Sequence, residues 1–137
     1  MKFVIDIEPK PQARHRSTIK NGRISTYEDK EMKFWKKNLA YLIKAQKPEC
    51  WANCALKMVI TFFIRPPQYI SKVKKNQEAL EAESMLVMVK PDLDNYEKAL
   101  MDAINGICYY DDGQVAKKSA RKIYSNNPRI EFEIYKI

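Results

Sequence analysis

The residues best suited to chemistry are four aspartates in the last third of the chain, arranged as two pairs. Asp92 and Asp94 lie two residues apart, and Asp111 and Asp112 are adjacent. Two carboxylates 4 Å apart repel each other by about 4 kcal/mol at an effective dielectric constant near 20, so a cluster of them needs a cation or bound protons. Carboxylate oxygens are the ligands that Mg²⁺ and Mn²⁺ prefer. The two pairs therefore form a candidate site for such an ion if the fold brings them together.

The charge of the whole chain indicates what such a site would act on. The chain carries 25 Lys and Arg against 17 Asp and Glu, a net charge of +8. A surplus of cations favours a polyanionic partner, which can be nucleic acid or acidic lipid. An acidic metal site within a basic protein indicates metal-assisted hydrolysis of a phosphodiester, with Lys98 supplying further positive charge to the transition state.

A purely structural explanation of the same residues is also available. Asp94 followed by Glu97 is a common pattern at a helix N-terminus, residues 111–113 (Asp-Asp-Gly) are typical of a turn, and Lys98 four residues after Asp94 suits a surface ion pair. This explanation accounts for each feature separately. It does not account for Asp92, nor for the concentration of acids in the one part of the chain that is not basic.

The elements around the aspartates must bring the two pairs together. Residues 94–105 are predicted to form a helix about 18 Å long, with Gly106 as the left-handed residue that follows it. Residues 107–110 are predicted to form a short strand. A chain that runs up the helix and returns along a strand would place the second aspartate pair beside the first.

The remaining elements follow from apolar periodicity. The strand at 55–64 is predicted to be central in its sheet and covered on both faces, and Asn21-Gly22 predicts a two-residue hairpin turn. This order predicts an α/β (α+β) fold, a mixed β-sheet with about two main helices packed on it, in one domain of residues 1–137 with a mobile insertion at 66–89. The other predicted elements are strands at 2–8, 114–124 and 130–134 and an amphipathic helix at 28–46.

The positive charge is unevenly distributed. Residues 1–90 contain 18 Lys and Arg against 9 Asp and Glu, whereas residues 91–137 contain 7 against 8. The first two thirds of the chain therefore supply the positive field that nucleic acid would meet. The candidate DNA contacts are basic residues of the hairpin region and of the strand that follows the second aspartate pair: Arg14, Arg16, Lys20, Arg23, Lys117, Lys118, Arg121 and Lys122.

Other features exclude several classes of protein. The three cysteines form no CxxC pair, so neither a disulfide framework nor a zinc knuckle is indicated. No apolar run approaches the 18–20 or so residues that span a bilayer, and Asp6 follows too soon after the start for a signal peptide. We therefore expect a soluble, cytoplasmic protein without a membrane partner.

Residues 90–137 resemble the RusA family of Holliday junction resolvases, the crossover junction endodeoxyribonucleases. The resemblance rests on KPDLDNYEK at 90–98, on DDGQV at 111–115, and more weakly on the basic Arg14-His15-Arg16 run before the first predicted helix. Tyr96 departs from the family pattern, which has an aliphatic residue there. Residues 66–89 show no useful similarity.

The resemblance implies a RusA-like fold and a small homodimeric, Mg²⁺-dependent endonuclease, with Mn²⁺ as a substitute ion. Many members are encoded by phages or prophages, and they nick two strands of four-way junction DNA symmetrically in recombination and repair. Carried over to this sequence, the resemblance makes Asp92, Asp94 and Asp112 the metal-binding and catalytic carboxylates, Asp111 a supporting acid at the metal, and Lys98 the catalytic lysine.

Two other functions stay open at the level of the sequence. One is a non-catalytic module that binds branched DNA, against which the complete set of acids argues. The other is a metal-dependent nuclease that acts on flaps, forks or RNA. Competition among branched, linear and RNA substrates separates the second from junction resolution.

Overall fold

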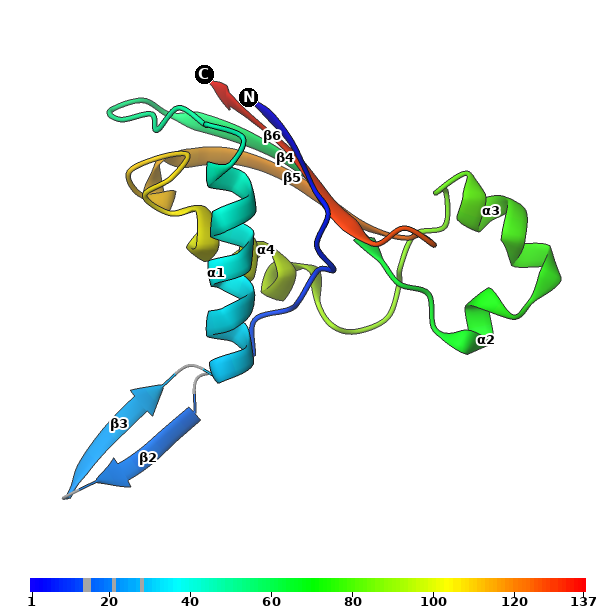
Figure 1. The fold of residues 1–137 in the computed structure, drawn as a ribbon, viewed down its shortest axis with the longest axis horizontal. Helices are drawn as coiled ribbons and strands as arrows, with labels where there is room; N and C mark the ends of the chain where they lie inside the picture. The colour runs from blue at the N-terminus through cyan, green and yellow to red at the C-terminus, as the bar shows by residue number, and fades with distance from the viewer. Residues whose placement is uncertain (14–15, 21, 28) are drawn as a thin grey trace.

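The protein is described by a computed structural model that covers residues 1–13, 16–20, 22–27 and 29–137. Its main element is a four-stranded mixed sheet (Figure 1). The strand order is β1 (Lys2–Ile5), β6 (Arg129–Lys136), β4 (Leu56–Ile64) and β5 (Val115–Tyr124). β4 pairs parallel to β5 and antiparallel to β6, and β1 pairs antiparallel to β6. The predicted fold class is thus confirmed.

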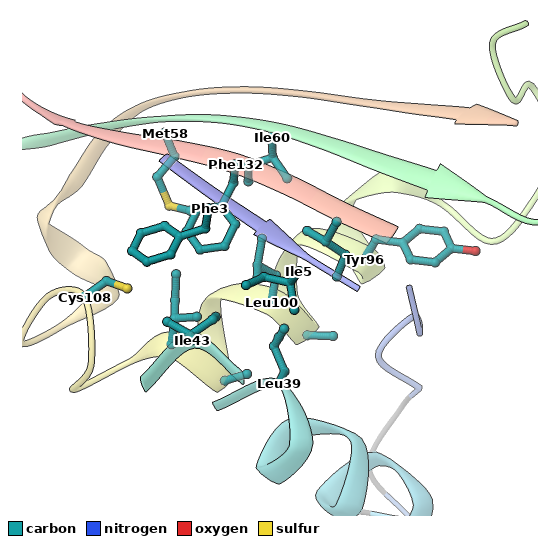
Figure 2. Close-up of a cluster of buried hydrophobic side chains, with 14 of the residues drawn as sticks. Phe3, Ile5, Leu39, Ile43, Met58, Ile60, Tyr96, Leu100, Cys108 and Phe132 are labelled. Atoms are coloured by element: carbon teal, nitrogen blue, oxygen red, sulfur yellow. The ribbon is translucent and has the colours of Figure 1, made fainter. Parts of the chain in front are cut away.

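Two helices, α1 (Lys30–Lys44) and α4 (Leu93–Ile104), pack on one face of the sheet. Asp29 caps α1, because its carboxylate accepts a 2.8 Å hydrogen bond from the Glu31 amide. The alternating strand residues and the apolar stripes of both helices form one core (Figure 2). Its members with almost no exposure include Ile5, Leu39, Ile43, Met58, Ile60, Phe62, Leu100, Ile104 and Phe132.

The opposite face of the sheet has no helix packed on it among the described residues, as Figure 1 shows. β4 is central, as predicted, but in the described part of the chain only one of its faces is covered by helices; on the other face Thr61 and Phe63 are still buried and Val59 is half-buried. Its outward residues Val59, Thr61 and Phe63 line a shallow pocket of about 240 Å³ together with Arg121 of β5. The Arg129 guanidinium lies over the Phe63 ring, 3.7 Å from its centre, and covers this apolar side chain where no helix does.

The predicted hairpin is present as a separate two-stranded sheet of β2 (Arg16–Lys20) and β3 (Arg23–Tyr27). Lys20 pairs with Arg23 across a two-residue turn, in which Gly22 has a φ of 74°. Positive φ is the conformation that such a turn needs. The hairpin extends away from the main sheet beyond the start of α1 (Figure 1).

The 66–89 region contains three short helical elements, α2 (Gln68–Ser71), η1 (Lys74–Asn76) and α3 (Gln77–Glu81). They lie beyond one end of the main sheet (Figure 1). After them, residues 85–87 run antiparallel to the end of β5, with hydrogen bonds of 3.0 Å from the Val87 amide to the Lys122 carbonyl and 2.9 Å from the Tyr124 amide to the Met85 carbonyl. The chain then reaches α4 through a cis Lys90–Pro91 peptide bond.

The segment between α4 and β5 differs from its prediction. Residues 107–110 form turns with isolated bridges from Tyr109 to Trp51 and Asn105, so the predicted strand is wrong. Gly106 follows the helix with a φ of 80°, as expected for the residue after a C-cap. The 3-10 turn η2 (Asp112–Gln114) leads directly into β5. The chain therefore reverses tightly at the C-terminal end of α4.

Candidate metal and nucleic-acid site

The first aspartate pair lies at the N-terminus of α4. Asp92 is the N-cap residue, but its side chain makes no capping hydrogen bond, and Asp94 lies in the first helical turn. Both are exposed, and neither has a side-chain partner among the described residues. The partial positive charge of a helix N-terminus favours carboxylates at this place. Two free carboxylates are thus available there to a cation.

The second pair lies in the turn before β5 and is more constrained. The Asp111 carboxylate accepts a 3.2 Å hydrogen bond from the Gly113 amide and caps η2, and the Gln114 side chain bonds back to the Asp111 amide at 3.1 Å. Gln114 also donates to the carbonyls of Trp51 and Cys54, each at 3.1 Å. Asp112 is exposed and has no side-chain partner among the described residues. The turn thus holds Asp111 in place and leaves Asp112 free.

The structure does not bring the two pairs together within one chain. Asp92 and Asp94 lie at the N-terminal end of α4, about 18 Å long for 12 residues, and the second pair follows its C-terminal end. β5 starts just after Asp112 and runs back, so that Lys122 bonds to the Pro91 carbonyl at 2.7 Å only at the far end of the strand. Among the described residues, no group of three or more potential metal ligands is close enough to hold an ion.

The predicted convergence is therefore wrong for a single chain, because the return after α4 is a tight turn rather than a strand. The donor chemistry still fits a divalent cation, since Asp92, Asp94 and Asp112 are oxygen donors without protein partners among the residues described. One chain presents these donors at two separate places. Each place offers one or two carboxylates, and Mg²⁺ commonly completes its coordination with water and phosphate oxygens.

Lys98 lies on α4 and pairs forward along the helix. Its Nζ is 3.5 Å from the Asp102 carboxylate, and Lys36 of α1 approaches the same carboxylate at 3.4 Å. The predicted alternative of an ion pair between Lys98 and Asp94 does not form in the structure. The sequence did not single out Asp102. Its spacing of four residues from Lys98 suits an ion pair along the helix.

The candidate DNA contacts on β5 lie on two faces of the strand, and the Lys122 ammonium donates its hydrogen bonds to the carbonyls of Val89 and Pro91. Lys118 pairs with Glu97 of α4 at 3.3 Å, on the face that packs against the helix. Arg121 donates a 3.1 Å hydrogen bond to the Thr61 hydroxyl on the open face, and Lys117 is exposed. Of the hairpin candidates, Arg16, Lys20 and Arg23 lie on β2 and β3, while Arg14 lies outside the described residues.

Tyr96 and Tyr109 support the two ends of α4 from within. Tyr96 is buried and packs on Phe62 with ring centroids 5.5 Å apart, and its burial raises the pKa of its hydroxyl. Tyr109 donates a 2.8 Å hydrogen bond to the Met101 carbonyl. Burial first, and then the negative charge of Asp112, raise the pKa of Tyr109. Both hydroxyls therefore stay protonated at neutral pH and serve packing.

No helix among the described residues is both long and apolar enough to cross a bilayer.

Comparison with known proteins connects this arrangement to an enzyme family. The chain is 32% identical over 137 residues to YqaN, an uncharacterized protein of Bacillus subtilis (strain 168), covering all of this chain and 96% of that protein. It is 29% identical over 140 residues to the crossover junction endodeoxyribonuclease RusA of Lactococcus phage r1t, covering 99% of this chain and 98% of the phage protein. The family model for endodeoxyribonuclease RusA matches residues 6–135.

RusA-type nucleases in general depend on a divalent metal ion, which agrees with the partner-free carboxylates at both ends of α4 in the described part of the chain. The family match covers almost the whole chain, from the end of β1 through β6, and includes both aspartate pairs. The chain belongs to the RusA family of endodeoxyribonucleases.

Proposed function

We propose that this endodeoxyribonuclease is a Mg²⁺-dependent resolvase that cuts Holliday junctions by paired nicks during DNA recombination and repair. The observation that carries the proposal is the set of exposed aspartates without partners among the described residues, Asp92, Asp94 and Asp112, in a chain of net charge +8. The phage relative is named for activity on crossover junctions, which supports junction DNA as the substrate.

The proposed metal site is shared between two copies of the chain. Asp92 and Asp94 of one protomer would hold the ion together with Asp112 of its partner, with Asp111 as a supporting acid. The support is geometric, because α4 separates the two pairs within a chain, while a two-fold dimer contains each pair twice. A homodimer built this way has two sites, as paired nicking requires.

The residues of the chain then have distinct roles in the reaction. When bound, the metal ion supplies Lewis acidity and an activated water at neutral pH. Lys98 would place its ammonium group against the phosphate, where negative charge increases in the transition state. Asp102 and Lys36 limit where the Lys98 ammonium can lie. Carboxylates without protein partners cost little reorganisation when they take up the cation.

The basic residues outside the metal site would bind the DNA arms. The proposed contacts lie on the hairpin (Arg14, Arg16, Lys20 and Arg23) and on β5 (Lys117, Lys118 and Arg121). Contacts to phosphate release counterions and carry no sequence information, which suits an enzyme that recognises branched shape.

The test is cleavage of a synthetic four-way junction in the presence of Mg²⁺. Wild type is expected to produce symmetric nicks, and Asp92→Asn is expected to bind the junction without cutting it, because the amide removes one anionic ligand. Asp6→Asn is the matched control, since Asp6 is also exposed and without a side-chain partner among the described residues but follows β1, outside both aspartate pairs. Equal cutting by Asp92→Asn and Asp6→Asn would overturn the assignment. A preference for linear duplex, flaps or RNA over the junction would overturn the substrate.

A further inference from the structure

The segment that carries Asp92 to the start of α4 is held by one residue of β5. The Lys122 ammonium donates hydrogen bonds to the carbonyls of Val89 at 2.5 Å and Pro91 at 2.7 Å. The Lys122 carbonyl accepts a 3.0 Å hydrogen bond from the Val87 amide. Within the described part of the chain, these are the hydrogen bonds made by the backbone of residues 86–91, and each of them has Lys122 as a partner.

Apolar packing contributes little to the position of this segment. The Leu86 side chain is 65% exposed, Met88 is 95% exposed and Val89 is 45% exposed. A segment with little buried surface is held mainly by its hydrogen bonds and opens easily when they are removed. The hydrogen bonds of Lys122 therefore decide where the chain lies as it approaches Asp92.

The chemistry of Lys122 is unusual for a lysine in a basic protein. It forms no ion pair with a carboxylate among the described residues, and two of its three N–H donors point at main-chain carbonyls. Pro91, one of those acceptors, directly precedes Asp92. The Asp92 side chain makes no capping bond of its own, so the backbone that Lys122 holds is what fixes the point from which its carboxylate extends.

We infer that Lys122 is a positioning residue for the metal-binding carboxylate of Asp92, an inference that rests on the proposed function of that site. Lys122 touches neither the phosphate nor the ion. It acts through the Val89 and Pro91 carbonyls, which fix the entry of the chain into α4. A metal site tolerates only small displacements of its ligands. Loss of the two hydrogen bonds of the Lys122 side chain is therefore expected to weaken metal binding more than DNA binding.

The experiment compares Lys122→Met, which keeps the aliphatic stem but removes the donors, with Lys122→Arg, which keeps donors and charge. Lys72→Met is the matched control, because this substitution removes the same charge. Lys72 is exposed and lacks a side-chain partner among the described residues. Two readouts are needed: Mn²⁺ affinity without DNA, from the decrease of the free-ion paramagnetic resonance signal, and the Mg²⁺ concentration for half-maximal nicking.

Lys122→Met is expected to raise the Mn²⁺ dissociation constant and the Mg²⁺ concentration for half-maximal nicking by about tenfold each. This is the usual effect of removing a residue that orients a metal ligand. Lys122→Arg is expected to restore most of the affinity, and junction binding without metal is expected to fall no more for Lys122→Met than for Lys72→Met. Wild-type Mn²⁺ affinity in Lys122→Met, or an equally weakened affinity in Lys72→Met, would overturn the inference.

Two further outcomes are informative. If circular dichroism finds Lys122→Met unfolded, Lys122→Gln takes its place, because it removes the charge and keeps one short donor group; unchanged Mn²⁺ affinity in that variant also overturns the inference. A wild-type protein that binds Mn²⁺ but nicks no junction overturns the proposed function, while the Mn²⁺ comparison still decides the role of Lys122.

Discussion

At the scale of single residues, Lys98 is paired with Asp102 along α4. The Asp102 carboxylate is one third exposed and accepts ion pairs from Lys98 at 3.5 Å and from Lys36 at 3.4 Å. An exposed ion pair contributes little to stability, so we expect the loss of Asp102 to have little effect on folding. Lys98 is the lysine proposed to act at the phosphate, and Asp102 is thus proposed to act through it.

Asp102→Asn is expected to lower the nicking rate by about tenfold while junction affinity changes little, because Lys98 is deprived of the partner that limits its rotamers. Single-turnover cleavage and binding isotherms measure the two effects separately. Glu31→Gln is the control, since it breaks a 3.4 Å ion pair with Lys10 that lies outside α4. An unchanged cleavage rate in Asp102→Asn would contradict the role of Asp102.

Glu83 anchors the end of the 66–89 region to β6. Arg129 forms a bidentate pair with it at 2.7 and 3.0 Å, and the Ser125 hydroxyl donates a 2.6 Å hydrogen bond to the same carboxylate. The hydrogen bond from Arg129 is the largest cause that lowers the pKa of Glu83 below its ordinary value of 4.5. A carboxyl with a lowered pKa stabilises the fold above its ordinary pKa, and this stabilisation disappears as the pH falls through the lowered value.

Glu83→Gln is therefore expected to lower the free energy of unfolding at pH 7 by about 1–3 kcal/mol, the usual cost of removing a charged hydrogen-bond partner. The difference from wild type is expected to shrink as the pH falls below 4.5, where wild-type Glu83 also becomes neutral. Urea unfolding at several pH values measures it. Glu81→Gln, at an exposed position without a side-chain partner among the described residues, is the control. A difference that stays constant with pH would contradict this account.

At the scale of elements, the β2–β3 hairpin is separable from the main sheet. It forms its own two-stranded sheet, whereas β4 pairs along its length with both β5 and β6. Ile19 near its tip is 76% exposed. Among the described residues, no main-chain pairing joins the hairpin strands to the main sheet. β5 is an edge strand of the main sheet, and the charges of Lys117 and Lys118 in its first half oppose pairing with another strand.

Replacing Arg16, Lys20 and Arg23 by Gln is expected to weaken junction binding. The slope of the logarithm of the binding constant against the logarithm of the salt concentration is also expected to become less steep, by about 0.9 for each phosphate that the hairpin no longer neutralises. The melting temperature is expected to stay nearly constant. The control replaces Lys72, Lys74 and Lys75 of the 66–89 region by Gln, which removes the same charge from that region. Equal effects of the two triple variants would mean that the hairpin has no specific role.

At the scale of the whole molecule, the arrangement of the aspartates predicts a dimer as the active species. Each chain has its two aspartate pairs at opposite ends of α4, and in the proposed two-fold dimer each metal site takes one pair from each protomer. The net charge of +8 per chain doubles in that dimer and provides the field for four DNA arms.

A mixed dimer of Asp92→Asn and Asp112→Asn protomers tests the shared site. If the ligands come from two chains, one site contains both substitutions and the other contains neither, so the purified heterodimer is expected to nick one strand. Each homodimeric variant is expected to be inactive. The measurement is cleavage by heterodimers isolated with two different affinity tags. An inactive heterodimer, with each protomer folded, would show that each site lies within one chain.

The sequence by itself determined the elements that depend on neighbouring residues. Apolar periodicity predicted α1, α4 and β4, the Asn21-Gly22 pair predicted the hairpin, and the DLDN and DD motifs predicted the family, since each of these signals lies within a few residues. Residue type alone does not decide burial, however, because the aromatic side chains of Phe34 and Tyr41 on α1 are 67% and 73% exposed.

Only the tertiary structure decided how these elements meet. The chain reverses tightly after α4, and this reversal leaves the two aspartate pairs at opposite ends of the helix. It could not be predicted, because the local pattern does not specify whether residues 107–110 form a strand or a turn. The hydrogen bond of Lys122 with Pro91 and the pair of Glu83 with Arg129 join residues 31 and 46 positions apart. Such interactions depend on the packing of the whole chain, which no short segment encodes. The aspartates could therefore be identified from the sequence as candidate metal ligands, whereas their placement at the two ends of one helix could not.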